Sequence, residues 1–387
     1  MILSFKPTRR VWHQVHRWAG VALALPFVLL AITGAVLAFG RELDGLFNPS
    51  LMTPSGGQRL ASVDLVLAAV QDDPPLPIVS VQAPDDVVPV WIVGLGAKHL
   101  HRAAAQEMGR GGVKTEIFVD PVNGRVLGRR TAADSPVRFI RQLHAAFLLG
   151  EDGRHLVGYV GVVLAVMLIS GLVLWWPKPR RFWQSVTVRH GARGQRLLLD
   201  WHNLLAFWPL PILLLVTLTG ITMEFPQTLR AALQVPAQMG MFRPMGQGIL
   251  PPAIAYPVTG QQAVETALAA HPGMVLASVT PAGRDLAVWK IGLRPGHGLA
   301  TARLQVSVDA NNGAVLPTDA GAAVPQWKRW YLGEQRALHG GALFGWPGRL
   351  LITLYGLVFA ALVVTGLLVF LRRQVIRRAA VMTAVQT

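Results

Sequence analysis

The hydrophobic residues of this chain are concentrated in four long runs that contain no charged residue. The runs are Trp18–Phe39, Leu156–Trp176, Trp201–Met223 and Leu350–Leu371, and each is 21 to 23 residues long. A helix that rises ~1.5 Å per residue needs about 20 residues to cross the hydrocarbon core of a bilayer. A buried core helix can also be apolar, but four such runs with charged flanks predict transmembrane helices.

The two long segments between the runs, 41–135 and 224–335, show short alternating patterns instead. Alternation predicts strands at Ile78–Val81, Val90–Val93, Val275–Val279 and Leu286–Ile291, and helix-like stretches lie upstream at Ser62–Gln71 and Gly260–Ala270. Asn123-Gly124 and Asn312-Gly313 are typical of type I′ hairpin turns, in which both central residues have positive φ. Each segment therefore predicts one helix packed on a small antiparallel sheet, an α+β unit.

The chain is an internal duplication, because matching residues recur at constant offsets. Arg141-Gln-Leu-His144 aligns with Arg336-Ala-Leu-His339, and His16 aligns with His202. Ser170-Gly171 matches Thr365-Gly366, and Thr33-Gly34 matches Thr219-Gly220. The predicted fold class is a membrane all-α four-helix bundle with two small α+β domains outside the membrane, built as two copies of helix, outer domain, helix.

These patterns divide the chain into eight parts. They are 1–40 (N-terminal segment and first helix), 41–135 (first outer domain), 136–176 (interfacial segment and second helix), 177–197 (basic loop), 198–223 (third helix), 224–335 (second outer domain), 336–371 (interfacial segment and fourth helix) and 372–387 (tail).

The net charge of +16 follows the expected topology, so nucleic acid is not an expected partner. The segment Pro177–Gln195 and the tail after Leu371 are basic and contain no acid, whereas loop 41–135 holds 11 acidic and 9 basic residues. Short basic loops stay in the cytoplasm. We therefore expect both termini and the middle loop in the cytoplasm, and the two long loops outside.

The metal chemistry open to the chain is limited by its composition. It contains no cysteine, which excludes disulfides, thiolate metal sites, iron–sulfur clusters and covalent c-type haem. The four runs contain no Asp or Glu, so a zinc or non-haem iron site within them is disfavoured. Any metal cofactor must therefore be held by histidine, methionine or oxygen ligands.

Histidines are placed selectively at the ends of the runs. His13 and His16 lie at the inner end of the first run and His202 at that of the third. His144 and His155 precede the second run and His339 precedes the fourth. A single interfacial histidine is more often a side chain at headgroup level. The duplication instead predicts two facing pairs at two depths, and facing imidazoles on different helices are what a bis-histidine haem b requires. We therefore expect two haems.

The repeat also ranks the candidate ligands. It favours His16 with His202, although His13 lies three residues away on the same helical face and only packing can decide between them. It favours His144 with His339, because His155 aligns with Leu350, and His155 stays in reserve. Arg141 and Arg336, three residues before the outer ligands, are candidates to pair with haem propionates. Headgroup anchoring explains them equally well.

Several motifs resemble the PepSY-associated transmembrane family. They are His16-Arg17-Trp18-Ala19-Gly20, Ile169-Ser170-Gly171-Leu172 with Trp175-Trp176-Pro177, and Asp200-Trp201-His202-Asn203; the outer Asp-x-x-Asn-Gly hairpins are similar to PepSY domains. The family includes FoxB-type ferrisiderophore reductases. The resemblance implies a two-haem protein of the bacterial inner membrane that passes electrons to ferric siderophores in the periplasm, with His16, His202, His144 and His339 as ligands.

The leading functional hypothesis is thus a haem-dependent ferric-siderophore reductase in a lipid bilayer. Its electron donor is a quinol or a cytoplasmic reductase, since no Gly-rich nucleotide fingerprint follows a strand. The alternative is a membrane-anchored binding or regulatory module without redox activity. A transporter is disfavoured, because the runs contain no acid and no obvious mid-helix break, despite Pro26 and Pro211.

Overall fold

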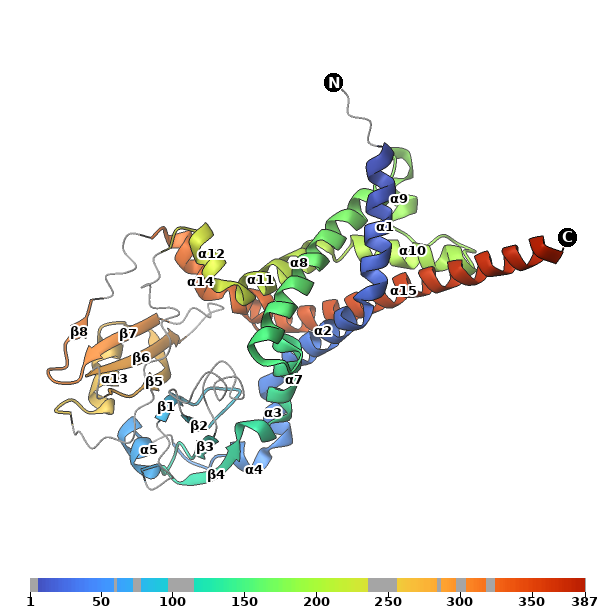
Figure 1. Cartoon of the computed structure of the whole chain (residues 1–387). Coiled ribbons are helices and arrows are strands. Elements are labelled where there is room, and N and C mark those ends of the chain that lie inside the picture. Colours follow the sequence, from blue (N-terminus) through green and yellow to red (C-terminus); the bar gives the residue numbers. More distant parts are fainter. Residues whose placement is uncertain are drawn as a thin grey trace.

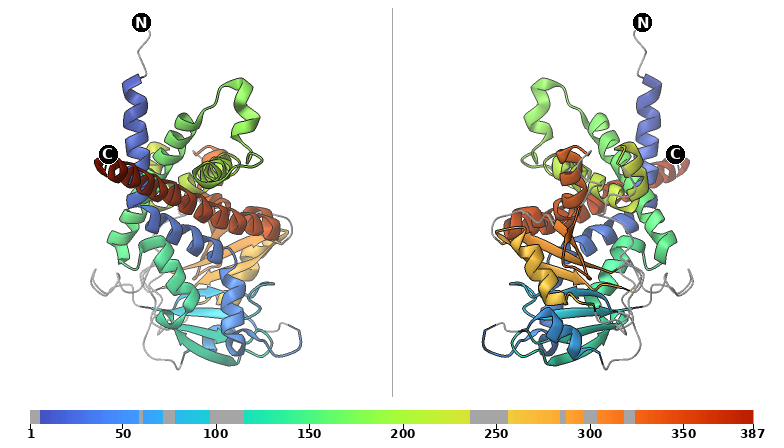
Figure 2. Two further views of the ribbon diagram at one scale, coloured as in Figure 1. Left: turned by 90° about the vertical axis from the view of Figure 1, so that its right-hand side faces the viewer. Right: turned by 90° about the vertical axis from the view of Figure 1, so that its left-hand side faces the viewer.

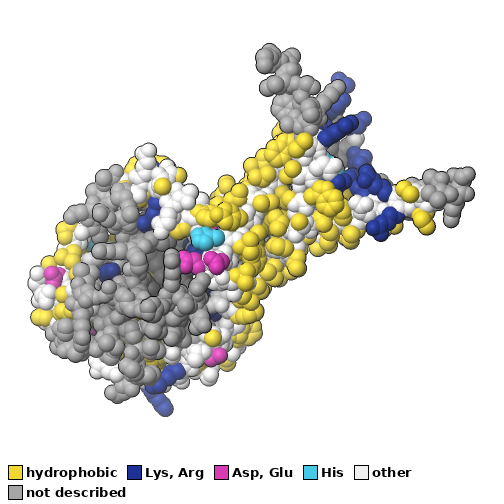
Figure 3. Space-filling view, viewed as in Figure 1, with side chains coloured by type: hydrophobic (Ala, Val, Ile, Leu, Met, Phe, Trp, Pro, Cys, Tyr) yellow, Lys and Arg dark blue, Asp and Glu magenta, His cyan; other side chains and the backbone are white. Residues whose placement is uncertain are grey.

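A helical part and a separate lobe built on a β-sheet make up the molecule (Figure 1). This computed structural model describes residues 6–58, 61–71, 78–96, 115–235, 256–283, 287–296, 304–317 and 324–386. Helix α1 begins, and helix α15 ends, at the side of the helical part away from the sheet (Figures 1 and 2). Lys and Arg gather there, and a hydrophobic band separates them from the lobe (Figure 3). We call these two sides the basic end and the sheet end.

The four apolar runs fall on two continuous helices and two bent helix pairs. The continuous helices are α8 (Gly150–Trp175) and α15 (Gly345–Gln386), and both are long and apolar enough to cross a membrane. The bent pairs are α1 (Lys6–Ala22) with α2 (Ala24–Leu37), at 63°, and α10 (Gly194–Phe207) with α11 (Leu210–Glu224), at 61°. The described residues therefore hold two candidate spans, or four if each bent pair is one span. Leu25 is 77% exposed and Leu357 is 52% exposed, as expected of side chains that face lipid.

Proline breaks both bent pairs, which corrects the expectation of unbroken runs. Pro26 has no N–H to bond the carbonyl of Ala22, and the helix is interrupted at Leu23. In the second copy Pro209 and Pro211 withdraw two further donors, and α10 ends at Phe207. The break recurs in both halves, so it belongs to the repeated architecture.

The spans pack crosswise. Helices α1 and α11 pack on α8, while α2 and α10 pack on α15. Two glycines allow close approach: a Cβ at Gly356 would lie 2.8 Å from the Ala31 carbonyl oxygen, and one at Gly161 would lie 3.0 Å from the Ile221 side chain. These glycines are equivalent in the duplication. Each lets one helix of a bent pair, α2 or α11, pack closely on a continuous span.

Short helices connect the spans to the lobe and to one another. They are α3 (Gly40–Phe47), α4 (Pro49–Met52), α7 (Pro136–Ala146), α9 (Phe182–Ser185), α12 (Pro226–Ala232) and α14 (Gln326–His339), with 3-10 turns at Ala132–Asp134, Pro179–Arg181 and Ala342–Phe344. Helix α7 packs on α2 and α14 packs on α11. Each of α7 and α14 immediately precedes a continuous span, α8 and α15 respectively.

The lobe contains one antiparallel sheet of eight strands in the order β4-β3-β2-β1-β5-β6-β7-β8. The strands are β1 (Ile78–Gln82), β2 (Trp91–Leu95), β3 (Thr115–Val119), β4 (Val126–Thr131), β5 (Met274–Thr280), β6 (Val288–Pro295), β7 (Leu304–Asp309) and β8 (Val315–Leu316). Helices α5 (Val63–Ala69) and α13 (Gly260–Ala269) supply one helix to each half. Leu286, the predicted start of one strand, lies outside the described residues.

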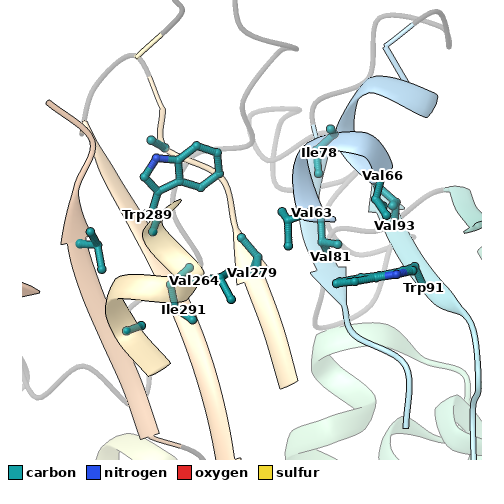
Figure 4. Close-up of a cluster of buried hydrophobic side chains, with 14 of the residues drawn as sticks. Val63, Val66, Ile78, Val81, Trp91, Val93, Val264, Val279, Trp289 and Ile291 are labelled. Carbon is teal, nitrogen blue, oxygen red and sulfur yellow. The ribbon is translucent and has the colours of Figure 1, made fainter. Parts of the chain in front are cut away.

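The two predicted α+β units are joined rather than separate. Strand β1 pairs with β5 in the register Val81 to Val279, which makes one sheet of the two halves. Buried residues from both halves then form one hydrophobic core (Figure 4). The helices also meet, since Asp64 at the start of α5 accepts from the backbone N–H of Gln261 on α13 at 3.2 Å.

The hairpins form where expected, but with a different turn. Gly124 and Gly313 have φ of 73° and 75°, while the preceding asparagines are not at positive φ. The N–H of Gly124 bonds the Asp120 carbonyl at 2.9 Å, and that of Gly313 bonds the Asp309 carbonyl at 2.9 Å. The turns are therefore four-residue loops with one left-handed glycine, and the type I′ prediction is wrong.

An ion cluster ties the sheet to the helical part. Arg130 on β4 pairs with Asp44 on α3 at 2.7 Å and with Glu116 on β3 at 2.6 Å. Its side chain is only 7% exposed. Glu116 also lies 3.7 Å from Arg138 on α7. Since α7 carries His144, the cluster fixes one histidine relative to the sheet.

Candidate functional site

The four histidines that the duplication singles out lie in two pairs between helices. His16 on α1 and His202 on α10 line one cavity of about 390 Å³ near the basic end. His144 on α7 and His339 on α14 meet near the sheet end, with ring centroids 6.2 Å apart and ring planes at 60°. Each pair draws one histidine from each copy of the repeat.

Each histidine makes the same polar contact through Nδ1 with a serine or threonine hydroxyl on another helix. The Nδ1-to-hydroxyl distances are 3.1 Å for His16 and Ser170, 3.0 Å for His144 and Thr33, 3.4 Å for His202 and Thr365, and 3.1 Å for His339 and Thr219. Backbone carbonyl oxygens also lie near these rings: 3.2 Å from His202 Nδ1 (Leu362) and 2.9 Å from His339 Nδ1 (Val216), with Met167 near His16 and Leu30 near His144.

These contacts place the imidazole proton on Nδ1. Each hydroxyl donates its own hydrogen to a carbonyl in the preceding turn, for example Thr33 to Leu29 at 2.6 Å and Thr219 to Leu215 at 2.7 Å. Ser170 and Thr365 do the same, to Met167 and Leu362. A hydroxyl that has donated its only hydrogen accepts from the ring, and a carbonyl can only accept. The lone pair is thus left on Nε2, the atom that a neutral histidine offers to a metal.

The residue after each hydroxyl is a glycine that contacts the histidine ring. A Cβ at Gly34 would lie 2.9 Å from Cε1 of His144, and one at Gly366 would lie 2.9 Å from Cε1 of His202. Gly171 with His16 and Gly220 with His339 repeat the arrangement at 3.0 and 3.1 Å. A Ser/Thr-Gly dipeptide therefore forms a seat for each ring: the first residue orients the ring, and the second gives it room.

The two reserve histidines are placed differently. His13 lines the same cavity as His16, but His16 makes the hydroxyl contact and lies on the glycine. His155 is exposed and stacks on Phe225, with centroids 6.1 Å apart and planes at 20°. His16 and His144 are thus the ones seated between helices.

Two equivalent arginines lie one helical turn before the histidines at the sheet end. Arg141 on α7 and Arg336 on α14 are exposed, and neither has a hydrogen-bond or ion-pair partner among the described residues. Desolvation by the surrounding protein and then the charge of Arg141 lower the pKa of Arg336. Glu224 acts on Arg336, and Glu116 and Asp44 act on Arg141, only at longer range. The two neighbouring cations therefore leave their hydrogen-bond donors open to an anion.

A second pair of equivalent arginines fastens the spans at the sheet end. Arg154 on α8 pairs with Glu224 of α11 at 3.1 Å. Arg349 on α15 pairs with Glu42 on α3 and donates to the Ala38 carbonyl at 2.7 Å. Each pair joins a continuous span to the outer end of a bent one, which holds the histidine seats together.

The arrangement supplies two nitrogen ligands per layer. Within the described part of the chain, no group of three or more His, Asp or Glu side chains is placed to hold a metal ion. A metal between two imidazoles would therefore need its other ligands from a group that brings its own.

Sequence comparison places these residues in a known context. The profile of a family described as PepSY-associated TM region matches residues 13–373. A protein of Pseudomonas aeruginosa named "Uncharacterized protein PA4219" is 38% identical over 79 residues, which are 20% of this chain and 19% of that protein. The chain thus aligns with about a fifth of the length of this relative. The family match contains all four seated histidines.

Proposed function

Since the chain belongs to the PepSY-associated transmembrane family, we propose that it is a membrane electron-transfer protein that holds two haem b groups and reduces iron in ferric siderophores. His16 with His202 would bind one haem, and His144 with His339 the other. The observation that carries the proposal is the fourfold seat, in which Nδ1 is bonded and Nε2 is left for a metal.

The spacing of the outer pair fits two imidazoles that would hold one metal between them. With a metal–nitrogen bond of about 2 Å and a ring centroid about 1 Å beyond the nitrogen, imidazoles on opposite sides of one metal would have centroids roughly 6 Å apart. The His144 and His339 centroids are 6.2 Å apart. The inner pair instead faces an open cavity with mostly apolar lining, which suits a flat macrocycle.

The protein between the two layers would keep water out and hold their separation. Phe27 and Phe359 lie between the pairs, are 2% and 8% exposed, and have centroids 6.2 Å apart. When bound, the haems would supply one-electron redox chemistry at two depths. The chain's own contribution is to fix the four Nε2 atoms on separate helices, so that neither layer depends on a mobile loop.

The proposed direction of transfer follows the charge distribution. The basic end would face the cytoplasm, where a quinol or a soluble reductase would be the donor. The lobe would face the periplasm of a bacterial inner membrane. Fe(II) binds the oxygen ligands of a siderophore less tightly than Fe(III), so reduction there would release the metal. Arg141 and Arg336 would meet anionic groups at this end.

Absorption spectra of purified histidine variants test the proposal. We expect low-spin b-type bands in the wild type, loss of one haem in His16→Ala and loss of the other in His144→Ala, with both kept in His13→Ala and His155→Ala. The dithionite-reduced wild type should reduce a ferric hydroxamate in vesicles, and His144→Ala should not.

A membrane-anchored binding module is the rival function. The eight-stranded sheet supports it, because its two halves share one buried cluster and form a single folded unit beside the helices. A wild-type protein that stays colourless when haem is plentiful, yet binds a partner through the lobe, would favour the rival over the reductase.

A further inference from the structure

The cavity that holds His16 and His202 is cationic at one end only. Arg17, Arg373 and Arg377 line it together with His13, and no Asp or Glu is among its lining residues. Along α15 the lining runs from Phe359, deep in the bundle, to Arg377 at the basic end. The cavity is therefore apolar inside and positively charged at its mouth.

Arg17 is only partly satisfied by the protein. One terminal nitrogen donates to Gln14, and the guanidinium lies 5.0 Å from the centre of the Trp18 ring. Its Nε, however, is buried without a hydrogen-bond partner among the described residues. A buried donor without an acceptor loses its hydrogen bond to water and gains none in return, so native structures rarely keep one. Since Arg17 lines the cavity, a group bound there can supply the missing acceptor.

The positive end is also asymmetric. In the duplication Arg17 is equivalent to Asn203, which lines the cavity on the opposite side. The basic-loop rule explains exposed arginines such as Arg378, but it requires neither a buried Nε nor a position in the cavity wall. Arg17 and Arg373 come from α1 and α15, two helices that pack on each other. The side of the cavity mouth formed by α1 and α15 can therefore bind anionic groups.

We infer that Arg17 and Arg373, with Arg377 behind them, bind the paired carboxylates of the porphyrin whose iron His16 and His202 hold. The inference rests on the proposed function, because it needs a haem in this cavity. We call Arg17 and Arg373 the carboxylate clamp. Arg17 adjoins His16 in sequence, so one arginine of the clamp and one iron ligand lie in the same helical turn. The porphyrin then has its carboxylate edge at the basic end and its apolar edge toward Phe27 and Phe359.

The test measures haem binding by the full-length protein in lipid nanodiscs. Apoprotein is reconstituted with haem or with haem dimethyl ester, whose carboxylates are blocked. In the wild type the ester should bind the His16/His202 site about tenfold more weakly than haem, the loss expected for a removed charge-assisted contact. The double variant Arg17→Gln/Arg373→Gln should bind both alike. Arg378→Gln, which alters an arginine outside the lining, should behave as wild type.

A redox titration gives a second readout. Removing two cations from the carboxylate edge should lower the midpoint potential of the inner haem alone, identified as the one lost in His16→Ala. If haem and its ester bind the wild type equally well, or the double variant leaves both affinity and potential unchanged, the clamp is refuted and the two-haem proposal stands. Release of anionic lipid from the double variant, with haem binding unchanged, refutes it in favour of a headgroup site. A wild-type protein that binds no haem would refute both the carboxylate clamp and the two-haem proposal.

Discussion

His144 and Thr33 are joined by a 3.0 Å contact between the ring Nδ1 and the threonine hydroxyl, although 111 positions separate them in the chain. The contact connects the interfacial helix α7 to the outer half of the first bent span. Because the Thr33 hydroxyl is already donated to Leu29, it can only accept, and it fixes which nitrogen of His144 faces the interior.

Removing this hydroxyl should weaken the outer site without unfolding the protein. Thr33→Val keeps the shape of the side chain but removes the hydroxyl that orients His144 Nδ1, leaving only the Leu30 carbonyl. Loss of such an orienting partner typically lowers metal affinity by roughly 10- to 100-fold. Haem titration of the outer site measures the effect. Thr353→Val, whose hydroxyl bonds the Ala35 carbonyl and no histidine, is the matched control.

The glycine of each seat should tolerate no side chain. In Gly34→Ala the new methyl group would lie 2.9 Å from Cε1 of His144, so the ring must move and its Nε2 with it. We expect loss of the outer low-spin spectrum while the inner haem remains. Gly45→Ala, which would meet only the Met52 sulfur at 3.7 Å, should keep both. An intact outer spectrum in Gly34→Ala would show that the seat is not needed.

The Arg130 cluster should contribute strongly to the stability of the lobe. Arg130→Met leaves Asp44 and Glu116 without their buried partner, and breaking such a pair costs roughly 3–5 kcal/mol. Denaturant unfolding followed by tryptophan fluorescence should show this loss. Arg125→Met, at an exposed position in the β3–β4 hairpin, should change stability by less than about 0.5 kcal/mol.

Acid should destabilise the lobe through two aspartates. Burial acts to raise the pKa of Asp120 and of Asp85, but hydrogen bonds outweigh it: from Ser55 and Val122 to Asp120, and from Val88, with the charge of Arg41, to Asp85. Both pKa values are therefore lowered. Their stabilisation is complete above the unfolded value of about 4 and is lost as the pH falls through the lowered native values. Circular dichroism during acidification from about pH 6 to about pH 2 should show unfolding of the lobe. Asp120→Asn should reduce the pH dependence of this unfolding.

The repeat made the candidate histidines predictable, because it preserved both the ring and the Ser/Thr-Gly dipeptide. The repeat did not show which Ser/Thr-Gly dipeptide contacts which histidine ring. His16 of α1 contacts Ser170 on α8, and His339 of α14 contacts Thr219 on α11. Such pairings depend on how the helices cross, which residue spacing along one helix does not specify.

Three features of the fold were missed for identifiable reasons. The pairing of Val81 with Val279 joins strands from segments that each form an acceptable small sheet alone, and local alternation says nothing about which edges meet. The bend at Leu23 arises from a proline that a membrane helix often absorbs with less distortion, so Pro26 alone did not indicate a 63° break. The hairpin turns differed because Asp120 and Asp309 cap them, which favours a longer loop.

We propose above that imidazoles from separate helices hold two haems in this chain. This proposal is tested most directly by the pyridine-haemochrome ratio and absorption spectrum of protein purified from cells supplied with haem. We expect two b-type haems per chain, both low-spin. A colourless protein, or one whose bound haem is unaffected by His16→Ala and His144→Ala together, would contradict it.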